Sequence, residues 1–259
     1  MKPIIFSTSG VQALLNTKPG TWPAEPIDPG RSCKSQTRRV IKPQPEHSQY
    51  HEYKGKPVHE SEYRMWCFKD FVVPDEYIPN SQGNLQTDMS PLCKYARYQV
   101  GDRLWVRETF YDGDMQGNMI YRADGKYDCD GVWKPSIHMP RHAARLFLEV
   151  KEVRVERLQD ISPHDACCEG VLVELPEPLQ RRQAGLPPEI PESWKWETKT
   201  PEQRDEVALG YARAIYMQEL FVLKTLIQKY EELWNAINGK GAWESNPWVW
   251  VYEFMRVEG

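Results

Sequence analysis

Apolar and polar residues alternate through the segment 145–158, and this alternation shifts by one position halfway along. Apolar side chains stand at positions 146, 148 and 150 and then at 153 and 155, so the apolar face changes near Lys151 and Glu152. Alternation with a period of two is typical of a β-strand, and a one-residue shift predicts a bulge or a tight bend. Because bent strands let a sheet turn a corner, the segment is compatible with a small β-barrel.

Two further segments predict strands, and one predicts a short helix. Residues 104–109 alternate in the same way after the turn signal Gly101-Asp102. The segment 248–257 is apolar on both faces, which favours a strand covered on both sides. Apolar residues at helical spacing predict a short helix over 10–16.

A long amphipathic helix is predicted over 206–237, where apolar residues recur at steps of mostly four and Asn238-Gly239 supplies a stop signal. Such a helix is about 48 Å long at 1.5 Å per residue, which is more than a small barrel needs. We therefore expect either a break near Met217 or a protruding N-terminal part. The apolar stripe predicts core packing, with a partner surface as the alternative.

A second short helix is predicted to start at Ser162, which precedes Pro163 and Asp165. Serine is a favoured N-cap, proline fits the first turn, and Asp165 is expected to reach back as the capping acid. Gly170 then ends this helix.

Two stretches lack sustained periodicity and contain many prolines, 43–98 and 175–200. The chain of 259 residues is long enough for one elaborated domain with a real core, so we interpret both stretches as insertions. Within the first, only 64–73 is typical of a strand or hairpin. Its length predicts either some structure of its own or a lid over the site.

The hydrophilic segment 34–39 concentrates three cations and two hydroxyls in the order Lys34-Ser35-Gln36-Thr37-Arg38-Arg39. In a turn or short helix Lys34 would lie against the Thr37 hydroxyl, whereas in an extended strand the two would point to opposite sides. A hydroxyl becomes a useful nucleophile when a partly buried amine with a lowered pKa takes its proton. A solvated cationic loop is the alternative interpretation.

Charge and composition limit the possible partners. The net charge is −4 and the pI about 5.9, so a contact with nucleic acid must come from a local patch such as 34–42. The six cysteines show no CxxC spacing, and we predict no metal and no cofactor. No run is apolar and long enough for a membrane span or a signal peptide, so a cytoplasmic location with free thiols is expected.

Four segments resemble ASCH-domain proteins, particularly the larger kind encoded by phages and prophages. These segments are 2–8, 34–42, 101–108 and 246–254, and they occur in the order of the family from end to end of the chain. The resemblance implies one α+β domain over 1–259, a PUA-like (ASCH) small β-barrel flanked by helices and carrying long insertions. ASCH domains are similar to PUA domains, which bind RNA.

The resemblance also implies site residues. In ASCH proteins that hydrolyse N4-acetylcytidine, a Lys and a Thr three residues later act with a Glu on a helix that follows the central strands. These positions match Lys34, Thr37 and Glu169 as catalytic residues, with a solvated helix residue as the alternative for Glu169. The expected substrate-binding residues are Ser35, Gln36, Arg38, Arg39, Trp105, Arg107 and Glu108. For Glu108 the alternative is a salt bridge to a site arginine, and for Trp105 and Trp248 a place in the core.

The resemblance therefore implies a protein that acts on a nucleoside or a base of single-stranded RNA, and the expected reaction is hydrolysis of the amide of N4-acylated cytidine by Thr37, Lys34 and Glu169. A non-catalytic RNA-binding module that uses the same cleft is the alternative, with the cations on phosphate and Trp105 or Trp248 stacked on a base. Ribonuclease activity is a third possibility. The sequence leaves the oligomeric state open.

Overall fold

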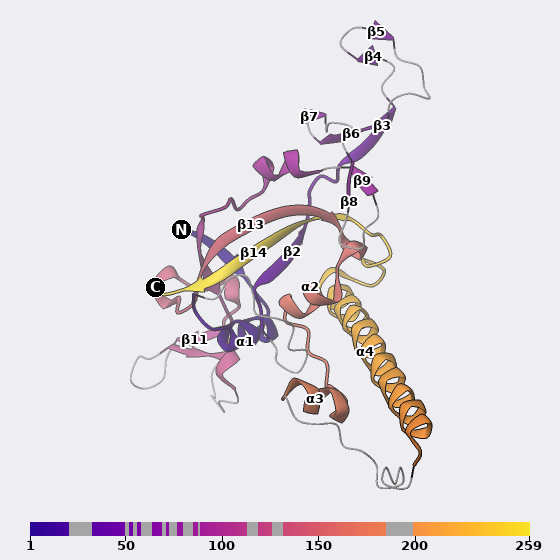
Figure 1. Cartoon of the computed structure of the whole chain (residues 1–259). Coiled ribbons are helices and arrows are strands. Elements are labelled where there is room, and N and C mark those ends of the chain that lie inside the picture. Colours follow the sequence, from indigo (N-terminus) through magenta and orange to yellow (C-terminus); the bar gives the residue numbers. More distant parts are fainter. Residues whose placement is uncertain are drawn as a thin grey trace.

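A curved five-stranded sheet forms the centre of the protein (Figure 1). The computed structural model describes residues 1–20, 33–49, 52–53, 56–57, 64–68, 71–72, 77–79, 85–87, 89–112, 119–125, 132–184 and 199–259. The strands lie in the order β1 (Lys2–Ile5), β10 (Arg103–Arg107), β13 (Phe147–Arg157), β14 (Trp248–Val257) and β2 (Gln36–Val40). β1 pairs with β10 in parallel, and all other pairs are antiparallel.

The sheet is open within the described part of the chain, because its edge strands β1 and β2 do not pair with each other. The protein is thus a mixed fold of an open sheet and a few helices. The described strands do not form the closed barrel that the sequence suggested.

The predicted irregularity in β13 is confirmed. Val150 pairs with Phe254 on β14, but the next pair joins Glu152 to Glu253, so Lys151 is an extra residue on β13. An extra residue of this kind bends a strand and increases its twist. β13 and β14 accordingly curve together across the molecule in Figure 1.

The last strand is covered on both sides, as predicted. Trp250, Tyr252 and Phe254 belong to one core cluster, which includes residues of β1, α1 (Thr8–Asn16) and β10. Val249 and Val251 point to the opposite face and belong to a second cluster with residues of α2 (Pro163–Cys168), α3 (Glu177–Gln183) and α4 (Pro201–Asn238). The sheet therefore separates two apolar cores, and β14 contributes to both.

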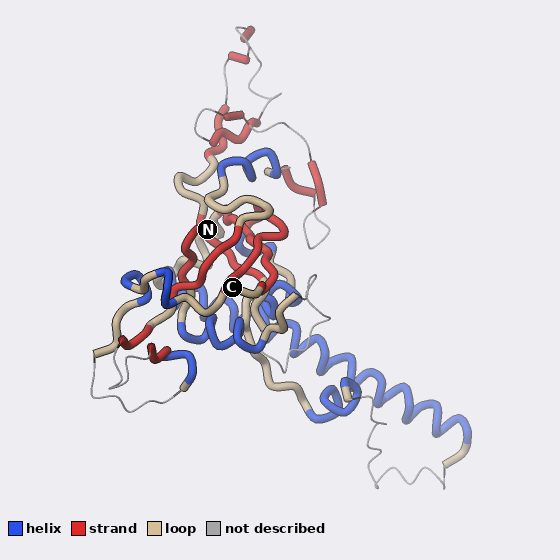
Figure 2. Tube along the Cα trace, turned by 90° about the vertical axis from the view of Figure 1, so that its left-hand side faces the viewer, coloured by secondary structure: helices blue, strands red, loops and turns tan. Residues whose placement is uncertain are grey.

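The long helix α4 is confirmed and runs without a break past Met217. It starts with a capping box between Thr200 and Gln203 and ends before Gly239. Its buried residues begin only at Val222, and its N-terminal half extends away from the sheet (Figure 2). Of the two alternatives, the protruding N-terminal part is therefore correct. No described helix is both long and apolar enough to cross a membrane.

The shorter helices largely follow their signals. α1 starts two residues before the predicted helix and is capped by Ser7, while α2 starts after Ser162 as predicted. α3 lies inside the stretch 175–200, where no helix was predicted. Five short 3₁₀ helices complete the described helical segments: η1 Ser90–Tyr95, η2 Arg122–Asp124, η3 Ser136–His138, η4 Arg141–Ala143 and η5 Leu158–Asp160.

The stretch 43–98 forms small hairpins of its own. Its described strands are β3 (Glu46–Gln49), β4 (Glu52–Tyr53), β5 (Lys56–Pro57), β6 (Arg64–Phe68), β7 (Phe71–Val72), β8 (Tyr77–Pro79) and β9 (Leu85–Thr87). The hairpin expected over 64–73 is confirmed by the antiparallel pairing of β6 with β7. These strands lie at the end of the molecule opposite α1 and α3 (Figures 1 and 2), so they do not cover α1.

Met89 and Leu92, near the end of the stretch 43–98, belong to the same core cluster as Trp250, Tyr252 and Phe254. A further pair, β11 (Phe110–Asp112) and β12 (Met119–Tyr121), follows β10.

Candidate functional site

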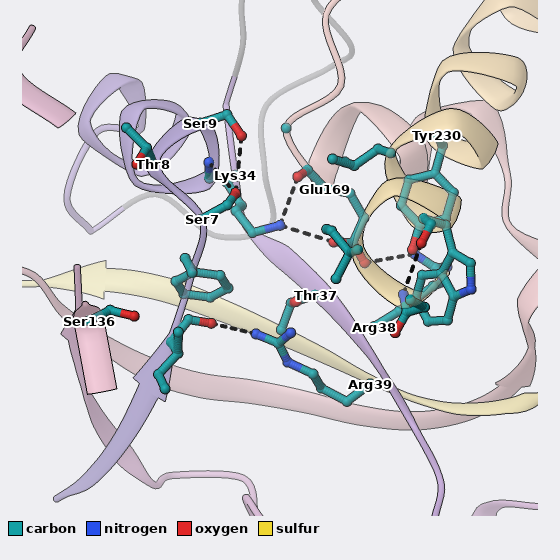
Figure 3. Close-up of a pocket in the computed structure, with 18 of the residues that line it drawn as sticks. Ser7, Thr8, Ser9, Lys34, Thr37, Arg38, Arg39, Ser136, Glu169 and Tyr230 are labelled. Carbon is teal, nitrogen blue, oxygen red and sulfur yellow. Dashed lines mark hydrogen bonds and ion pairs between the residues drawn. The ribbon is translucent and has the colours of Figure 1, made fainter. Parts of the chain in front are cut away.

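A cavity of about 690 Å³ lies where β1, α1, β2 and α4 meet (Figure 3). Its walls are the end of β1 and the first turn of α1, the strand β2, the residues that follow α2, and the last turns of α4. Small-molecule sites commonly have volumes of roughly 300 to 1,000 Å³. The cavity is therefore large enough for a nucleoside.

Lys34 and Glu169 meet in this cavity because the chain segments that carry them are paired. The two residues form an isolated antiparallel bridge, and the neighbouring Ser35 N–H donates to the Cys168 carbonyl at 2.9 Å. The Lys34 Nζ donates to the Glu169 backbone carbonyl at 2.7 Å and to its Oε2 at 3.0 Å. Both side chains are buried, so this ion pair is shielded from water.

Burial lowers the pKa of Lys34 from its usual value, because the charged ammonium loses its hydration. Glu169 opposes the shift through its charge and its hydrogen bond, while the guanidinium groups of Arg39 and Arg38 add to it. The aliphatic part of Lys34 lies against the start of α1, and its Nζ is 5.2 Å from the centre of the Phe6 ring. The surroundings thus favour a neutral amine more than water does.

Thr37 lies on β2, so the segment 34–39 is an extended strand for most of its length and not a turn. The residue is 4% exposed and lines the cavity. Its hydroxyl makes no hydrogen bond to any residue that the structure describes. Figure 3 shows it in the same hollow as Lys34 and Glu169. The three residues that the resemblance singled out therefore line one cavity.

Arg38 holds the carboxylates behind the cavity. Its side chain is 0% exposed, and its Nη2 lies 3.0 Å from Asp165 Oδ2 and 3.1 Å from Glu156 Oε2. Its Nη1 donates to Gln36 Oε1 at 2.9 Å and lies 3.5 Å from Glu169 Oε1. The Arg38 guanidinium therefore fixes the Oε1 atom of the Glu169 carboxylate, while Lys34 binds the Oε2 atom.

Asp165 does not cap its own helix, which corrects the sequence interpretation. Ser162 Oγ does accept from the Asp165 N–H at 3.1 Å, but the Asp165 carboxylate binds Arg38 and Gln36 instead of reaching back. Burial alone would raise the pKa of Asp165, but the charges of Arg38 and Arg154 outweigh it and hold the pKa below its usual value. Asp165 and Glu156 are parts of the site that sequence reasoning missed.

Arg38 and Arg39 line the cavity, but the other expected substrate-binding residues do not. Arg39 Nη2 donates to the Ile5 carbonyl at 2.6 Å, at the end of β1. Ser35 and Gln36 are buried and are absent from the described walls of the cavity.

Trp105, Arg107 and Glu108 lie on or just after β10 and do not line the cavity, although the next residue, Thr109, does. Trp105 is buried, and the Arg107 guanidinium lies 4.7 Å from the centre of its ring. Glu108 is paired, as its alternative interpretation expected, but its partner is Arg145 at 2.8 Å and not an arginine of the cavity.

The cavity contains residues that the sequence analysis did not select. Ser7, Thr8 and Ser9 surround the N-terminus of α1, and Tyr230 and Trp234 come from the last turns of α4. Burial raises the pKa of Tyr230 well above its usual value, and the charge of Glu169 adds to this. The run Ser7-Thr8-Ser9 overlaps the end of the resembling segment 2–8. Its hydroxyl residues were the sequence signal that could have pointed to the N-terminus of α1 as part of the site. No local signal marks which turn of a long helix reaches a site.

Gly170 brings the end of α2 close to α1, and we expect Gly170→Ala to lower the free energy of unfolding by about 1 to 3 kcal/mol. Gly170 has a φ of +94°, and a Cβ placed on it would lie 3.0 Å from the Ala13 Cβ. Urea denaturation measures the change. The matched control is Gly210→Ala in the exposed part of α4, which should stabilise by about 0.5 to 1 kcal/mol because alanine favours a helix. Equal effects of the two variants would contradict this role of Gly170.

Comparison of the chain with known protein families, with curated proteins and with solved structures found no match. Among the described residues, no group of three or more His, Cys, Asp or Glu side chains is placed to hold a metal ion. The arrangement provides a buried hydroxyl, a buried amine with a lowered pKa and a carboxylate within hydrogen-bonding distance of that amine. These groups can carry out nucleophilic attack coupled to proton transfer.

Proposed function

We propose that the protein is an amidohydrolase of the ASCH type, with a PUA-like fold, that removes the acyl group from N4-acylated cytidine. The observation that carries the proposal is the convergence of Lys34, Thr37 and Glu169 on one buried cavity, with Lys34 Nζ 3.0 Å from Glu169 Oε2. Two of these residues are three positions apart, and the third comes from a segment far along the chain. The bent strand β13 is in keeping with a PUA-like fold.

Thr37 Oγ attacks the acyl carbon of the substrate while Lys34 Nζ takes the hydroxyl proton. The bond between the acyl carbon and N4 breaks, and the proton passes through Glu169 to N4 of the departing cytidine. Water then attacks the ester on Thr37 and releases the carboxylic acid, which restores the hydroxyl. Arg38 keeps Glu169 in position for the proton transfer, since it lies 3.5 Å from Oε1.

The test is to incubate the purified protein with N4-acetylcytidine and to follow cytidine release by chromatography. Wild type should release cytidine, and Thr37→Ala should lower the rate by at least roughly a hundredfold, because it lacks the nucleophile. Thr225→Ala is the matched control, since Thr225 lies on α4 outside the cavity and its hydroxyl donates only to the Phe221 carbonyl. Absence of turnover by wild type, or equal turnover by Thr37→Ala, would exclude this activity.

A non-catalytic module that binds single-stranded RNA is the second candidate. It is favoured by the cations that line the cavity, Lys34, Arg38, Arg39 and Lys42. Trp105 and Trp248 are both buried, so stacking of a base on either ring does not support this candidate. A protein that binds RNA mainly through its phosphates loses affinity steeply as the salt concentration rises, whereas the activity of a nucleoside hydrolase depends little on salt. Turnover measured across a salt series therefore separates the two candidates.

A further inference from the structure

We propose that the N-terminus of α1 and Arg39 form a phosphate-binding subsite next to Lys34 and Thr37, so that the ligand is a phosphorylated nucleoside. The inference rests on the proposed function for the nucleoside part of the ligand. The phosphate subsite itself is argued from the wall of the cavity.

The first turn of α1 presents donors to the cavity without an acid to occupy them. Ser7 Oγ accepts from the Gly10 N–H at 3.2 Å, and the Val11 N–H donates to the Ser7 carbonyl. The N–H groups of Thr8 and Ser9 have no acceptor among the described residues, and no acidic residue lies in this turn. Free N–H groups and the positive end of the helix dipole favour an anion there.

The position of α1 places this turn beside the reactive groups. A Cβ added to Gly10 would lie 3.8 Å from the Lys34 Cδ, so the helix start packs directly on the lysine. Figure 3 shows Ser7, Thr8 and Ser9 on the same side of the hollow as Lys34. A phosphate on the first turn would therefore belong to a ligand that also reaches Lys34.

Thr37 is an independent indication that the cavity takes a ligand. The residue is 4% exposed and lines the cavity, and its hydroxyl has no hydrogen-bond partner in the part of the chain that the structure describes. The hydroxyl of a residue that is almost wholly buried normally has a hydrogen-bond partner. A bound polar molecule would supply the missing partner.

Arg39 is held in place with most of its donors unused. Its Nη2 donates to the Ile5 carbonyl, two residues before the Ser7 cap, and its guanidinium carbon lies 5.7 Å from the centre of the Phe6 ring. Among the described residues, no carboxylate pairs with it. A guanidinium carries five N–H donors in a planar fork that matches phosphate oxygens. Arg39 can therefore bind a phosphate without giving up its anchor.

The charges of the cavity wall favour an anion although the whole chain is acidic, with a net charge of −4. Glu169 compensates Lys34, and Glu156 and Asp165 compensate Arg38 from behind. The two remaining cations of the wall, Arg39 and Lys42, have no carboxylate partner in the described part of the chain. This excess of positive charge fits a phosphate group.

Isothermal titration of the full chain with cytidine and with its 5′- and 3′-monophosphates tests the subsite. We expect at least one monophosphate to bind roughly 10- to 100-fold more tightly than cytidine, as a few charge-assisted hydrogen bonds would give. Arg39→Gln should remove most of this preference. Lys224→Gln, which removes an exposed cation of α4 outside the cavity, should keep it.

A second variant, Ser9→Asp, keeps the test valid if Arg39→Gln fails to fold. Ser9→Asp adds a carboxylate at the N-terminus of α1, which stabilises a helix but repels a phosphate, so the preference should be lost in a protein of undiminished stability. Equal affinity of wild type for cytidine and every phosphorylated ligand would overturn the inference. A preference that persists in both Arg39→Gln and Ser9→Asp would also overturn it.

A single-stranded oligocytidylate in the same titration separates the two sources of the phosphate. If a monophosphate binds more tightly than the oligomer, the ligand of the subsite is a free nucleotide. If the oligomer binds more tightly, the ligand is single-stranded RNA. Turnover assays with N4-acetylcytidine and its 5′-phosphate separate this inference from the proposed function. Phosphate preference without acyl removal retains the subsite and excludes the hydrolase, whereas acyl removal with equal binding of both ligands excludes the subsite alone.

Discussion

Lys34→Met should lower kcat for N4-acetylcytidine by roughly 10²- to 10⁴-fold, the usual contribution of a positioned proton acceptor. Lys34→Arg should lose about as much, because arginine keeps the positive charge but cannot accept a proton at ordinary pH. The pair of variants thus separates proton removal from charge stabilisation. If Lys34 only supplies charge, the arginine variant will retain a substantial part of the activity.

The pH profile provides a second readout for Lys34. Only the neutral amine can take a proton from Thr37, so kcat/KM should rise with pH as Lys34 loses its own proton. Since burial lowers the pKa of Lys34, this rise should occur below the usual range of a lysine. Wild-type activity in both Lys34→Arg and Lys34→Met, with unchanged thermal unfolding, would show that the amine has no part in the reaction.

Arg38→Met should lower the free energy of unfolding by about 3 to 5 kcal/mol at neutral pH, because it leaves buried carboxylates without their partner. The Arg38 side chain is fully buried and lies against Glu156, Asp165 and Glu169. Urea denaturation at pH 7 measures the loss. Arg213→Met is the matched control, since it removes an exposed arginine of α4 and should change the stability by less than about 0.5 kcal/mol.

The loss should shrink at acid pH. Burial alone would raise the folded-state pKa of Asp165, but the charges of Arg38 and Arg154 hold this pKa below its usual value. The ionised carboxylate therefore stabilises the protein at pH values above its unfolded-state pKa. That contribution disappears as the pH falls through the folded-state pKa, and wild type and Arg38→Met should then converge. A change below about 1 kcal/mol at pH 7 would contradict the role assigned to the buried network, given the size expected for such a pair.

Local sequence patterns predicted β13, β14 and α4 because each of these elements carries its own periodicity. The shift near Lys151 marked the bulge in β13, and the apolar faces of 248–257 marked a strand between two cores. These signals depend only on which side chains are buried along one segment. They contain no information about which segment lies next to which.

Three of the expected substrate-binding residues, Trp105, Arg107 and Glu108, do not line the cavity. β10 carries Trp105 and Arg107, whereas the cavity is lined by Thr109, which follows this strand, and by Ile5 of the neighbouring strand β1. Neither the alternation along a strand nor the residue type indicates which side chains near its end will face a cavity that other segments help to form. The resemblance to ASCH proteins selected Lys34, Thr37 and Glu169 but gave no reason to expect Asp165, whose partner Arg38 is 127 residues away in sequence.

β14 contributes alternate residues to both apolar cores, and this has a consequence for how the protein opens. Removing the strand from either core exposes Trp250 and Tyr252 on one face and Val249 and Val251 on the other. Neither core can then melt while the other stays intact. Backbone amides on the two sides of the sheet should therefore share one global protection against hydrogen exchange, and the two sides should behave as a single cooperative unit.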